Sequence, residues 1–267
     1  MKLQHVISTM HQTEFSVLES MNCKCDMLVV NQTDEEKTEQ AVLNGCSAKM
    51  IYTTERGLSN SRNMLLENAD GDVVLIGDDD LVYVDGYEEI IAEAHEKYPE
   101  ADIIAFNFTE SEFENTRKHA VEPTYLNLFS ISKTSSVEIT IKLERVKQKN
   151  ISFDTLLGLG AEFGSGEENA FLADCLRAGL KILYIPQVIC YIPPMPEERV
   201  KWQDGFNEDY FVKKGACFHR IYKNKFLLFS AAFILLKKRN VFKNVPVLKA
   251  ISWMIRGKKE YKKTAKE

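Results

Sequence analysis

Residues 73–87 read VVLIGDDDLVYVDGY, so an apolar run ends in three consecutive aspartates, Asp78, Asp79 and Asp80. Carboxylates this close raise one another's pKa and destabilise the fold unless a cation neutralises them. A solvated turn is the simplest explanation of the cluster, because Asp is common in turns. A bound Mg²⁺ or Mn²⁺ is the alternative, because both ions prefer oxygen ligands. An EF-hand loop is excluded, because Tyr83 stands where that loop needs a glycine.

Strand-like and helix-like segments alternate through the first half of the chain. The short apolar segments that are typical of strands cover residues 5–10, 26–31, 49–54, 72–77 and 102–108. The helix-like segments between them cover residues 12–21, 34–44, 59–69 and 86–97. Ser59 and Asp85 are the expected N-caps of the last two helices. This alternation predicts an α/β fold with a mostly parallel sheet that helices cover on both faces.

Polar side chains stand at the carboxyl ends of three predicted strands. Thr9 lies at the end of the first strand, and Asn31 and Gln32 end the second. Asp78 and Asp79 follow the fourth. Ligands bind beyond the carboxyl ends of the strands in sheets of this kind. We therefore expect these five residues to contact a nucleotide, with its metal beside the aspartates.

A glycine-rich loop leads to a second acidic pair, Glu167 and Glu168. Four glycines lie in this loop, at 158, 160, 164 and 166, and a predicted helix begins with the acidic pair. Carboxylates in the first turn of a helix suit its dipole, which is one explanation of the pair. The pair also stands between a flexible loop and a helix–Gly179–strand unit. That arrangement is more specific than a helix cap and favours a role in chemistry.

Four segments together resemble the family 2 glycosyltransferases with the GT-A fold, of the bacterial cell-surface or capsular polysaccharide type. They are VISTM (6–10), GLSNSRNMLLENADGDVVLIGDDD (57–80), GSGEENAFLADCLRAGLKI (164–182) and KWQDGFNEDYFVKKGA (201–216). The resemblance covers roughly residues 1–220. It implies a Rossmann-like nucleotide-diphospho-sugar transferase sheet covered by helices.

The resemblance also implies roles for the acidic residues. In that family an aspartate motif holds a divalent metal and the nucleotide diphosphate, and a G-E-D motif supplies a base. Asp78, Asp79 and Asp80 are therefore the expected ligands of Mn²⁺ or Mg²⁺. Gly77 replaces the family's first aspartate, so the metal and ribose roles are spread over all three. Glu168 replaces the aspartate of G-E-D and is the expected general base.

Four further residues have expected places around the substrate. Glu167 is expected to orient the acceptor or the loop, with Gly166 beside the substrate. Arg62 is expected to meet a phosphate or an aspartate, and a surface salt bridge is the alternative. Trp202 is expected to stack on a sugar, and ordinary core packing is the alternative. His219 is left out of the metal site, because a lone histidine is more often not a ligand.

The resemblance implies a metal-dependent, inverting hexosyltransferase of polysaccharide biosynthesis. Such an enzyme moves a sugar from a nucleotide-diphosphate donor, commonly a UDP-sugar, to a hydroxyl of a glycan or lipid-linked acceptor. Two alternatives stay open. One is a haloacid-dehalogenase-like phosphatase, with Asp78 as phosphoryl acceptor and Asp80 as acid and base, although that motif normally lies on the first strand. The other is a non-catalytic sugar-nucleotide-binding module, which the glutamate at 168 would allow.

The last 47 residues differ from the rest of the chain in charge. Residues 221–267 hold thirteen Lys or Arg and two Asp or Glu, a formal charge of +11, whereas residues 1–220 carry −16. An acidic body argues against nucleic acid as a partner. We therefore expect a GT-A domain at 1–220 and a basic amphipathic helical tail at 221–267.

The tail mixes apolar and basic residues. Residues 226–236, FLLFSAAFILL, are apolar but shorter than the roughly 20 residues that span a bilayer. The mixture predicts an interfacial helix on anionic lipid, and a helical hairpin packed on the catalytic domain or in a homo-oligomer is the alternative. The first 15 residues lack a signal sequence, and the cysteines predict reduced thiols. These features favour a cytoplasmic protein, peripheral on the inner face of the plasma membrane.

Overall fold

The computed structural model describes residues 1–109, 120–193, 206–238 and 245–266. The strands are β1 (Leu3–Met10), β2 (Asp26–Gln32), β3 (Lys37–Leu43), β4 (Cys46–Thr53), β5 (Val73–Asp78), β6 (Val82–Tyr83), β7 (Ile103–Thr109), β8 (Thr124–Tyr125), β9 (Ile139–Lys142) and β10 (Ile182–Tyr191). The α-helices are α1 (Ser16–Ser20), α2 (Leu58–Asn68), α3 (Tyr87–Lys97), α4 (Leu143–Lys147), α5 (Glu167–Arg177), α6 (Glu208–Tyr222), α7 (Phe226–Lys238) and α8 (Val247–Thr264). Short 3₁₀ turns are η1 (Ser130–Lys133), η2 (Ser136–Glu138) and η3 (Lys223–Lys225).

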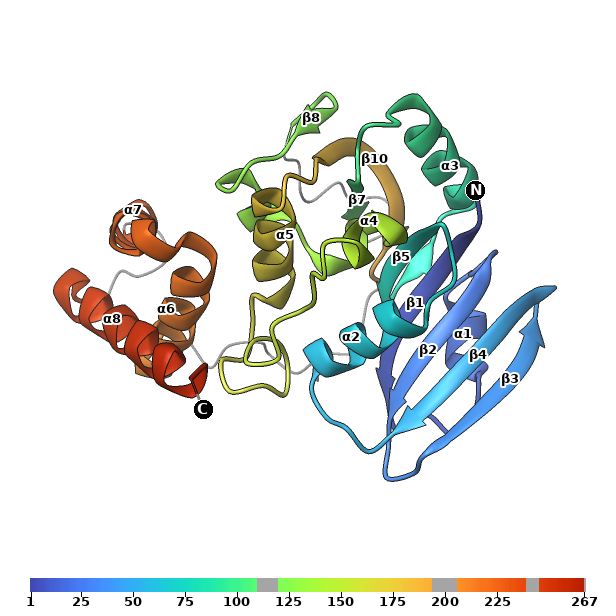
Figure 1. The fold of residues 1–267 in the computed structure, drawn as a ribbon, viewed down its shortest axis with the longest axis horizontal. Helices are drawn as coiled ribbons and strands as arrows, with labels where there is room; N and C mark the ends of the chain where they lie inside the picture. The colour runs from blue at the N-terminus through green and yellow to red at the C-terminus, as the bar shows by residue number, and fades with distance from the viewer. Residues whose placement is uncertain (110–119, 194–205, 239–244, 267) are drawn as a thin grey trace.

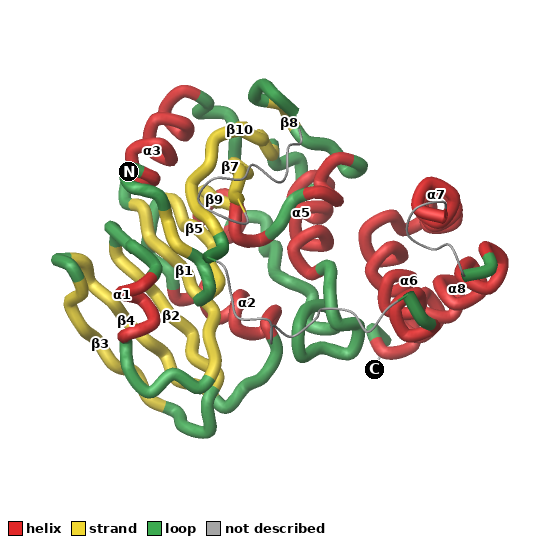
Figure 2. Tube along the Cα trace, turned by 180° about the vertical axis from the view of Figure 1, so that it is seen from behind, coloured by secondary structure: helices red, strands yellow, loops and turns green. Residues whose placement is uncertain are grey.

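Helices cover both faces of the central sheet, as the sequence predicts. Alternate residues of β1 enter different cores: Val6 packs in one buried cluster with Leu65 of α2, and Ile7 packs in the other with Leu18 of α1. This alternation follows from the period of two along a strand. Helix α2 lies in front of the sheet in Figure 1, and α1 lies in front of it in Figure 2, which is drawn from behind. The predicted α/β architecture is therefore confirmed.

The sheet is mixed rather than mostly parallel, which corrects that expectation. Its strand order is β3-β4-β2-β1-β5-β9-β7-β10-β6, and β8 pairs with β10. Strands β4, β2, β1 and β5 are parallel neighbours, and so are β7 and β10. The four-residue strand β9 separates these two groups and pairs antiparallel with both β5 and β7. Such pairing is set by contacts distant in sequence, so local periodicity does not reveal it.

The helix expected at 34–44 is wrong, because this segment forms β3. The chain turns back on itself at Asn44 and Gly45, which both have positive φ, 51° and 82°. Leu43 then faces Cys46 in an antiparallel hairpin of β3 and β4. An Asn-Gly pair between two strands is the usual sequence of such a two-residue turn.

Two expected helix caps and one helix length also need correction. Helix α2 is preceded by Gly57 and α3 by Gly86, neither with a side-chain cap. Ser59 instead donates a hydrogen bond to the carbonyl of Leu157 at 2.7 Å. Asp85 accepts one from the Asn22 side chain. The helix expected at 12–21 shrinks to α1, five residues long.

Helix α8 packs directly against α6 through two glycines. A Cβ atom placed on Gly257 of α8 would lie 1.9 Å from the Val212 carbonyl oxygen of α6, and one on Gly215 would lie 2.2 Å from the Met254 carbonyl oxygen. The two helices run side by side beyond α5, with α7 next to them (Figures 1 and 2). In the described part of the chain, every helix is too short or too polar to cross a lipid bilayer.

We predict that Gly257→Ala destabilises the protein by about 1–3 kcal/mol, because a methyl group has no room between the two backbones. Urea unfolding followed by circular dichroism measures the change. Lys259→Ala, at an exposed position of the same helix, is the matched control and should leave the free energy of unfolding nearly unchanged. Equal stability of the two variants would mean that α8 does not rest on α6 in solution.

Candidate active site

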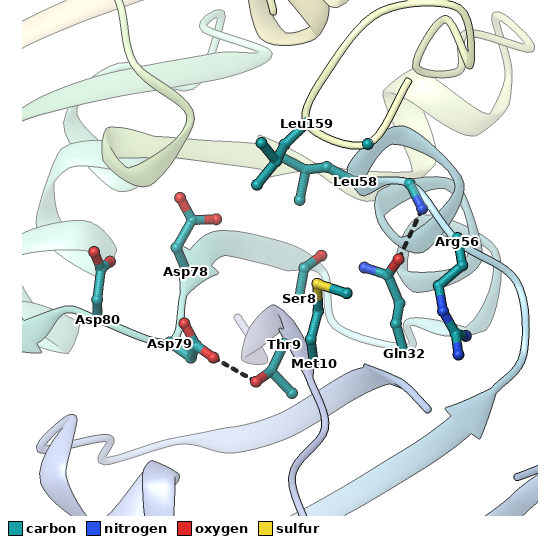
Figure 3. Close-up of a pocket in the computed structure, with 12 residues that line it drawn as sticks. Ser8, Thr9, Met10, Gln32, Arg56, Leu58, Asp78, Asp79, Asp80 and Leu159 are labelled. Carbon is teal, nitrogen blue, oxygen red and sulfur yellow. Dashed lines mark hydrogen bonds between the residues drawn. The ribbon is translucent and has the colours of Figure 1, made fainter. Parts of the chain in front are cut away.

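A cavity of ≈ 400 Å³ opens at the carboxyl ends of β1, β2 and β5. The parallel register places these ends together, because Ser8 of β1 lies opposite Asp78 of β5 and Thr9 lies opposite Asn31 of β2. The lining residues are Ser8, Thr9, Met10, Gln32, Arg56, Gly57, Leu58, Asp78, Asp79, Asp80, Leu159 and Gly160. Figure 3 shows the three aspartates on one side of the cavity and Gln32 and Arg56 on the other.

The three aspartates line this cavity, and polar side chains beside them donate hydrogen bonds to the carboxylates of Asp78 and Asp79. Asp79 accepts a hydrogen bond from the Thr9 hydroxyl (Figure 3), and Asp78 accepts one from Arg62 at 3.0 Å. Burial raises the pKa of Asp79, and the neighbouring charges of Asp78 and Asp80 raise it further, against the bond from Thr9. A bound cation would remove this penalty.

The carboxylate oxygens of the three aspartates suit a hard cation that also binds a substrate. No group of three His, Cys, Asp or Glu side chains is already arranged for a metal within the described residues. Mg²⁺ in proteins, however, is commonly bound by one or two carboxylates together with substrate phosphates. Asp78, Asp79 and Asp80 supply oxygen atoms on one cavity wall, so they fit an ion that arrives with a diphosphate.

Arg62 joins the aspartates to the acidic pair of α5. Its side chain is 2% exposed and donates to Glu167 Oε1 at 2.8 Å, to Asp78 Oδ1 at 3.0 Å and to Ser136 Oγ at 2.8 Å. Burial opposes its charge, but the adjacent carboxylates of Asp78 and Glu167 hold its pKa above the ordinary value. The expected contact with an aspartate is therefore present, and the alternative of a surface salt bridge is wrong.

The acidic pair stands at the start of α5, as the sequence predicts. Gly166 precedes the helix with φ +91°, and a Cβ on it would lie 2.3 Å from Cys217 Sγ, so a side chain is excluded. Glu167 is buried and bound to Arg62. Glu168 is partly exposed; burial of its carboxyl raises its pKa, the adjacent Glu167 raises it further, and Arg62 opposes both. The pKa of Glu168 is thus held above the ordinary range of a glutamate.

The other expected site residues are less uniform in their placement. Gln32 lines the cavity and accepts a hydrogen bond from the Gly57 backbone N–H at 2.7 Å. Asn31 is buried outside the lining and bonds the backbone of Gln12 through both ends of its amide. Trp202 lies outside the described residues. His219 lies on α6 beside the rings of Phe226 and Tyr261.

Seven lining residues were not among the predicted site residues, namely Ser8, Met10, Arg56, Gly57, Leu58, Leu159 and Gly160. Ser8 and Met10 are the neighbours of Thr9 at the end of β1. Leu159 and Gly160 belong to the glycine-rich loop, whose backbone also bonds the start of α2, since the Leu58 N–H donates to the Leu159 carbonyl at 2.9 Å. The glycines at 158 and 160 signalled a loop near the acidic pair, but not its contact with α2.

Comparison with known proteins agrees with this architecture. The family described as "Glycosyl transferase family 2" matches residues 7–156. Three solved structures of TarS from S. aureus are similar at 15% identity. Residues 1–349 with UDP-GlcNAc give a TM-score of 0.64 over 91% of this chain and 74% of that one. The same form with UDP gives 0.62 over 96% and 81%, and a longer TarS chain gives 0.61 over 91% and 45%. No functionally curated protein matches the chain.

We predict that Arg62→Leu destabilises the protein by about 3–5 kcal/mol, because it leaves buried carboxylates without their counter-charge. Urea unfolding near neutral pH measures the loss. Arg56→Leu is the matched control: Arg56 lines the same cavity, but its pair with Asp34 is solvent-exposed, so the loss should be much smaller. Similar losses for the two arginines would contradict a structural role specific to Arg62.

Proposed function

The chain belongs to glycosyl transferase family 2 and has the GT-A fold, and on this premise we propose that it is a metal-dependent, inverting glycosyltransferase of the hexosyl type. It would move a sugar from a nucleotide-diphosphate donor to a hydroxyl of a glycan or lipid-linked acceptor. The observation that supports this best is the bridge of Arg62 between Asp78, at the cavity wall, and Glu167, beside Glu168. The carboxylates proposed for the leaving diphosphate and the helix start proposed for the entering hydroxyl are thereby linked through one arginine.

A UDP-sugar is the proposed donor. The cavity of ≈ 400 Å³ falls within the usual size of small-molecule sites. TarS, which shares the fold, has been solved with UDP-GlcNAc and with UDP. Thr9, Gln32 and Arg56 offer hydroxyl, amide and guanidinium groups on the cavity wall. These groups suit the hydroxyls and phosphates of a nucleotide.

Asp78, Asp79 and Asp80 are the proposed ligands of Mn²⁺ or Mg²⁺. Such an ion would offset the charge that develops on the departing diphosphate. The protein holds Asp79 and Asp78 in advance, because Thr9 bonds Asp79 and Arg62 bonds Asp78. Positioning before substrate arrives is what makes electrostatic stabilisation effective.

Glu168 is the proposed general base. The acceptor hydroxyl oxygen forms a bond to the anomeric carbon, the bond from that carbon to the diphosphate breaks, and the hydroxyl proton passes to Glu168. One displacement from the face opposite the leaving group inverts the anomeric centre. Glu167 is committed to Arg62, so it would serve as a positioning residue. Gly166 and Trp202 remain proposed neighbours of the substrate.

The two alternative functions have less support. A haloacid-dehalogenase-like phosphatase would need Asp78 as its nucleophile, yet Asp78 is bound to Arg62, and the family match is to transferases. A non-catalytic binding module would rest on the glutamate at 168. A glutamate carboxylate has the same proton chemistry as an aspartate, so this replacement does not remove the base.

The proposed setting is polysaccharide biosynthesis, such as capsule formation, at the inner face of the plasma membrane. A lipid-linked acceptor would be met there by a cytoplasmic enzyme. The basic tail at 221–267, with a formal charge of +11, suits a surface of anionic lipid. Assembly of a homo-oligomer is the alternative role of this tail.

We predict that Glu168→Gln lowers sugar transfer by at least about a hundredfold, because the proton of the acceptor hydroxyl loses its acceptor. Donor binding, measured by calorimetry with Mn²⁺, should persist. In the wild type the base works only when ionised and its pKa is raised, so the transfer rate should rise with pH above the ordinary range of glutamate.

Glu162→Gln is the matched control for this experiment, because Glu162 is an exposed glutamate of the same glycine-rich loop. It should transfer sugar at nearly the wild-type rate. A crippled Glu167→Gln together with a nearly normal Glu168→Gln would exchange the two roles.

We also predict that Asp80→Ala abolishes the Mn²⁺-dependent part of donor binding while the protein stays folded, because the cation loses a ligand. A thermal-shift titration with UDP-sugars, with and without Mn²⁺, measures this, since a bound ligand raises the melting temperature. Asp209→Ala, at an exposed position of α6, is the control. Unchanged donor affinity in Asp80→Ala would remove Asp80 from the metal site.

A further inference from the structure

We infer that the outward face of α7 is a lipid-binding surface that lies flat on an anionic bilayer. The inference rests on the proposed function for its biological setting, because an acceptor carried by lipid must be met at a membrane. It goes further by naming the face that makes contact, and by separating α7 from α8 within the basic tail.

Helix α7 carries its apolar side chains outward. Leu227, Leu228, Leu235 and Leu236 are 58%, 67%, 63% and 74% exposed. Positions i, i+1, i+8 and i+9 lie on one side of a helix with 3.6 residues per turn. Ser230, the only polar residue of α7 before Lys237, is 1% exposed. The usual arrangement of a surface helix, with polar residues outward, is therefore reversed.

The inward face of α7 is fixed by aromatic packing. The ring of Phe229 stacks on Tyr222 of α6 with centroids 3.9 Å apart, and Phe233 contacts Phe218 of α6 at 5.1 Å. Ile234 is 1% exposed. Because these contacts set the rotation of the helix about its axis, the four leucines are held toward solvent.

Cations flank the leucine stripe at both ends. Lys223 and Lys225 precede α7, and Lys237 stands at its end; all three are exposed. Leu248, 82% exposed, and Lys249 repeat the combination at the start of α8. Apolar residues that enter the acyl boundary beside cations that meet anionic headgroups are typical of interfacial helices. This charge pattern favours a lipid surface over a protein partner.

Helix α8 packs on α6, which agrees with the packed hairpin that the sequence left open as the alternative for the tail. Met254 is fully buried, and Gly257 meets the backbone of α6. Trp253 stacks near Phe211 of α6, with ring centroids 5.9 Å apart. Most apolar residues of α8 are thus committed to packing inside the protein, and α7 presents the apolar surface to the membrane.

The test is flotation of the full-length protein with vesicles of phosphatidylcholine containing phosphatidylglycerol. We expect wild type to float with these vesicles at low salt, and to float less with pure phosphatidylcholine or in high salt, where charges are screened. The double variant Leu228→Ser/Leu235→Ser should lose at least about tenfold in partitioning, because two apolar side chains no longer enter the bilayer. Lys225→Glu/Lys237→Glu should weaken binding to the anionic vesicles selectively.

Val42→Ser/Val121→Ser is the matched control, since these two valines are 75% and 78% exposed elsewhere on the surface; it should float like wild type. UDP release from the donor is measured in parallel and should be unchanged by the leucine variant, so failure of the lipid inference is distinguishable from failure of the proposed chemistry. Equal flotation of the leucine variant and wild type would overturn the inference. The inference would also be overturned if the wild type did not bind vesicles but formed a dimer, and the leucine variant did not form that dimer.

Discussion

The buried charge of Arg62 is the constraint on which the site depends. A guanidinium that is 2% exposed needs carboxylates beside it, because an unpaired buried charge is strongly destabilising. Asp78, at the end of β5, and Glu167, at the start of α5, supply them, and Glu167 lies 105 residues from Arg62 in sequence. The ion pairs of this one arginine therefore fix the distance between the cavity wall at Asp78 and the helix that carries Glu168. The same ion pairs of Arg62 therefore stabilise the fold and set the position of α5 relative to β5.

The C-terminal helices α6 and α8 contact the segments on both sides of the glycine-rich loop, so they also help to position the acidic pair. Gly166, before α5, fits closely against Cys217 of α6, and Arg220 of α6 donates to Asp154 at 2.6 Å, just ahead of the glycine-rich loop. Tyr261 of α8 donates to the same Asp154 carboxylate. The loop and the helix that carry the acidic pair are thus supported by α6 and α8, while α7 keeps an apolar face outward. Within the tail, α8 therefore supports the loop, and α7 exposes an apolar surface.

Sequence reasoning worked where a local pattern has one physical outcome. The apolar run that ends in Asp78 specifies the end of a strand, whichever strands pair with it. The glycines that precede Glu167 specify the start of a helix in the same way. It failed at 34–44, where Glu, Lys, Gln and Ala favour a helix but Asn44-Gly45 makes a tight hairpin. It could not predict that Arg62 is buried or that Arg56 lines the cavity, because each depends on how segments distant in sequence fold around the side chain. Burial, unlike periodicity, is a tertiary property.

The stereochemistry of donor cleavage tests the proposed mechanism without knowledge of the acceptor. Proton NMR can follow the sugar that is first released when the full-length protein hydrolyses an α-linked UDP-sugar with Mn²⁺ present. Attack from the face opposite the diphosphate predicts that the β-anomer appears first, before mutarotation, and only when metal is added. Initial release of the α-anomer, or turnover that is independent of metal, would contradict a metal-dependent inverting transferase.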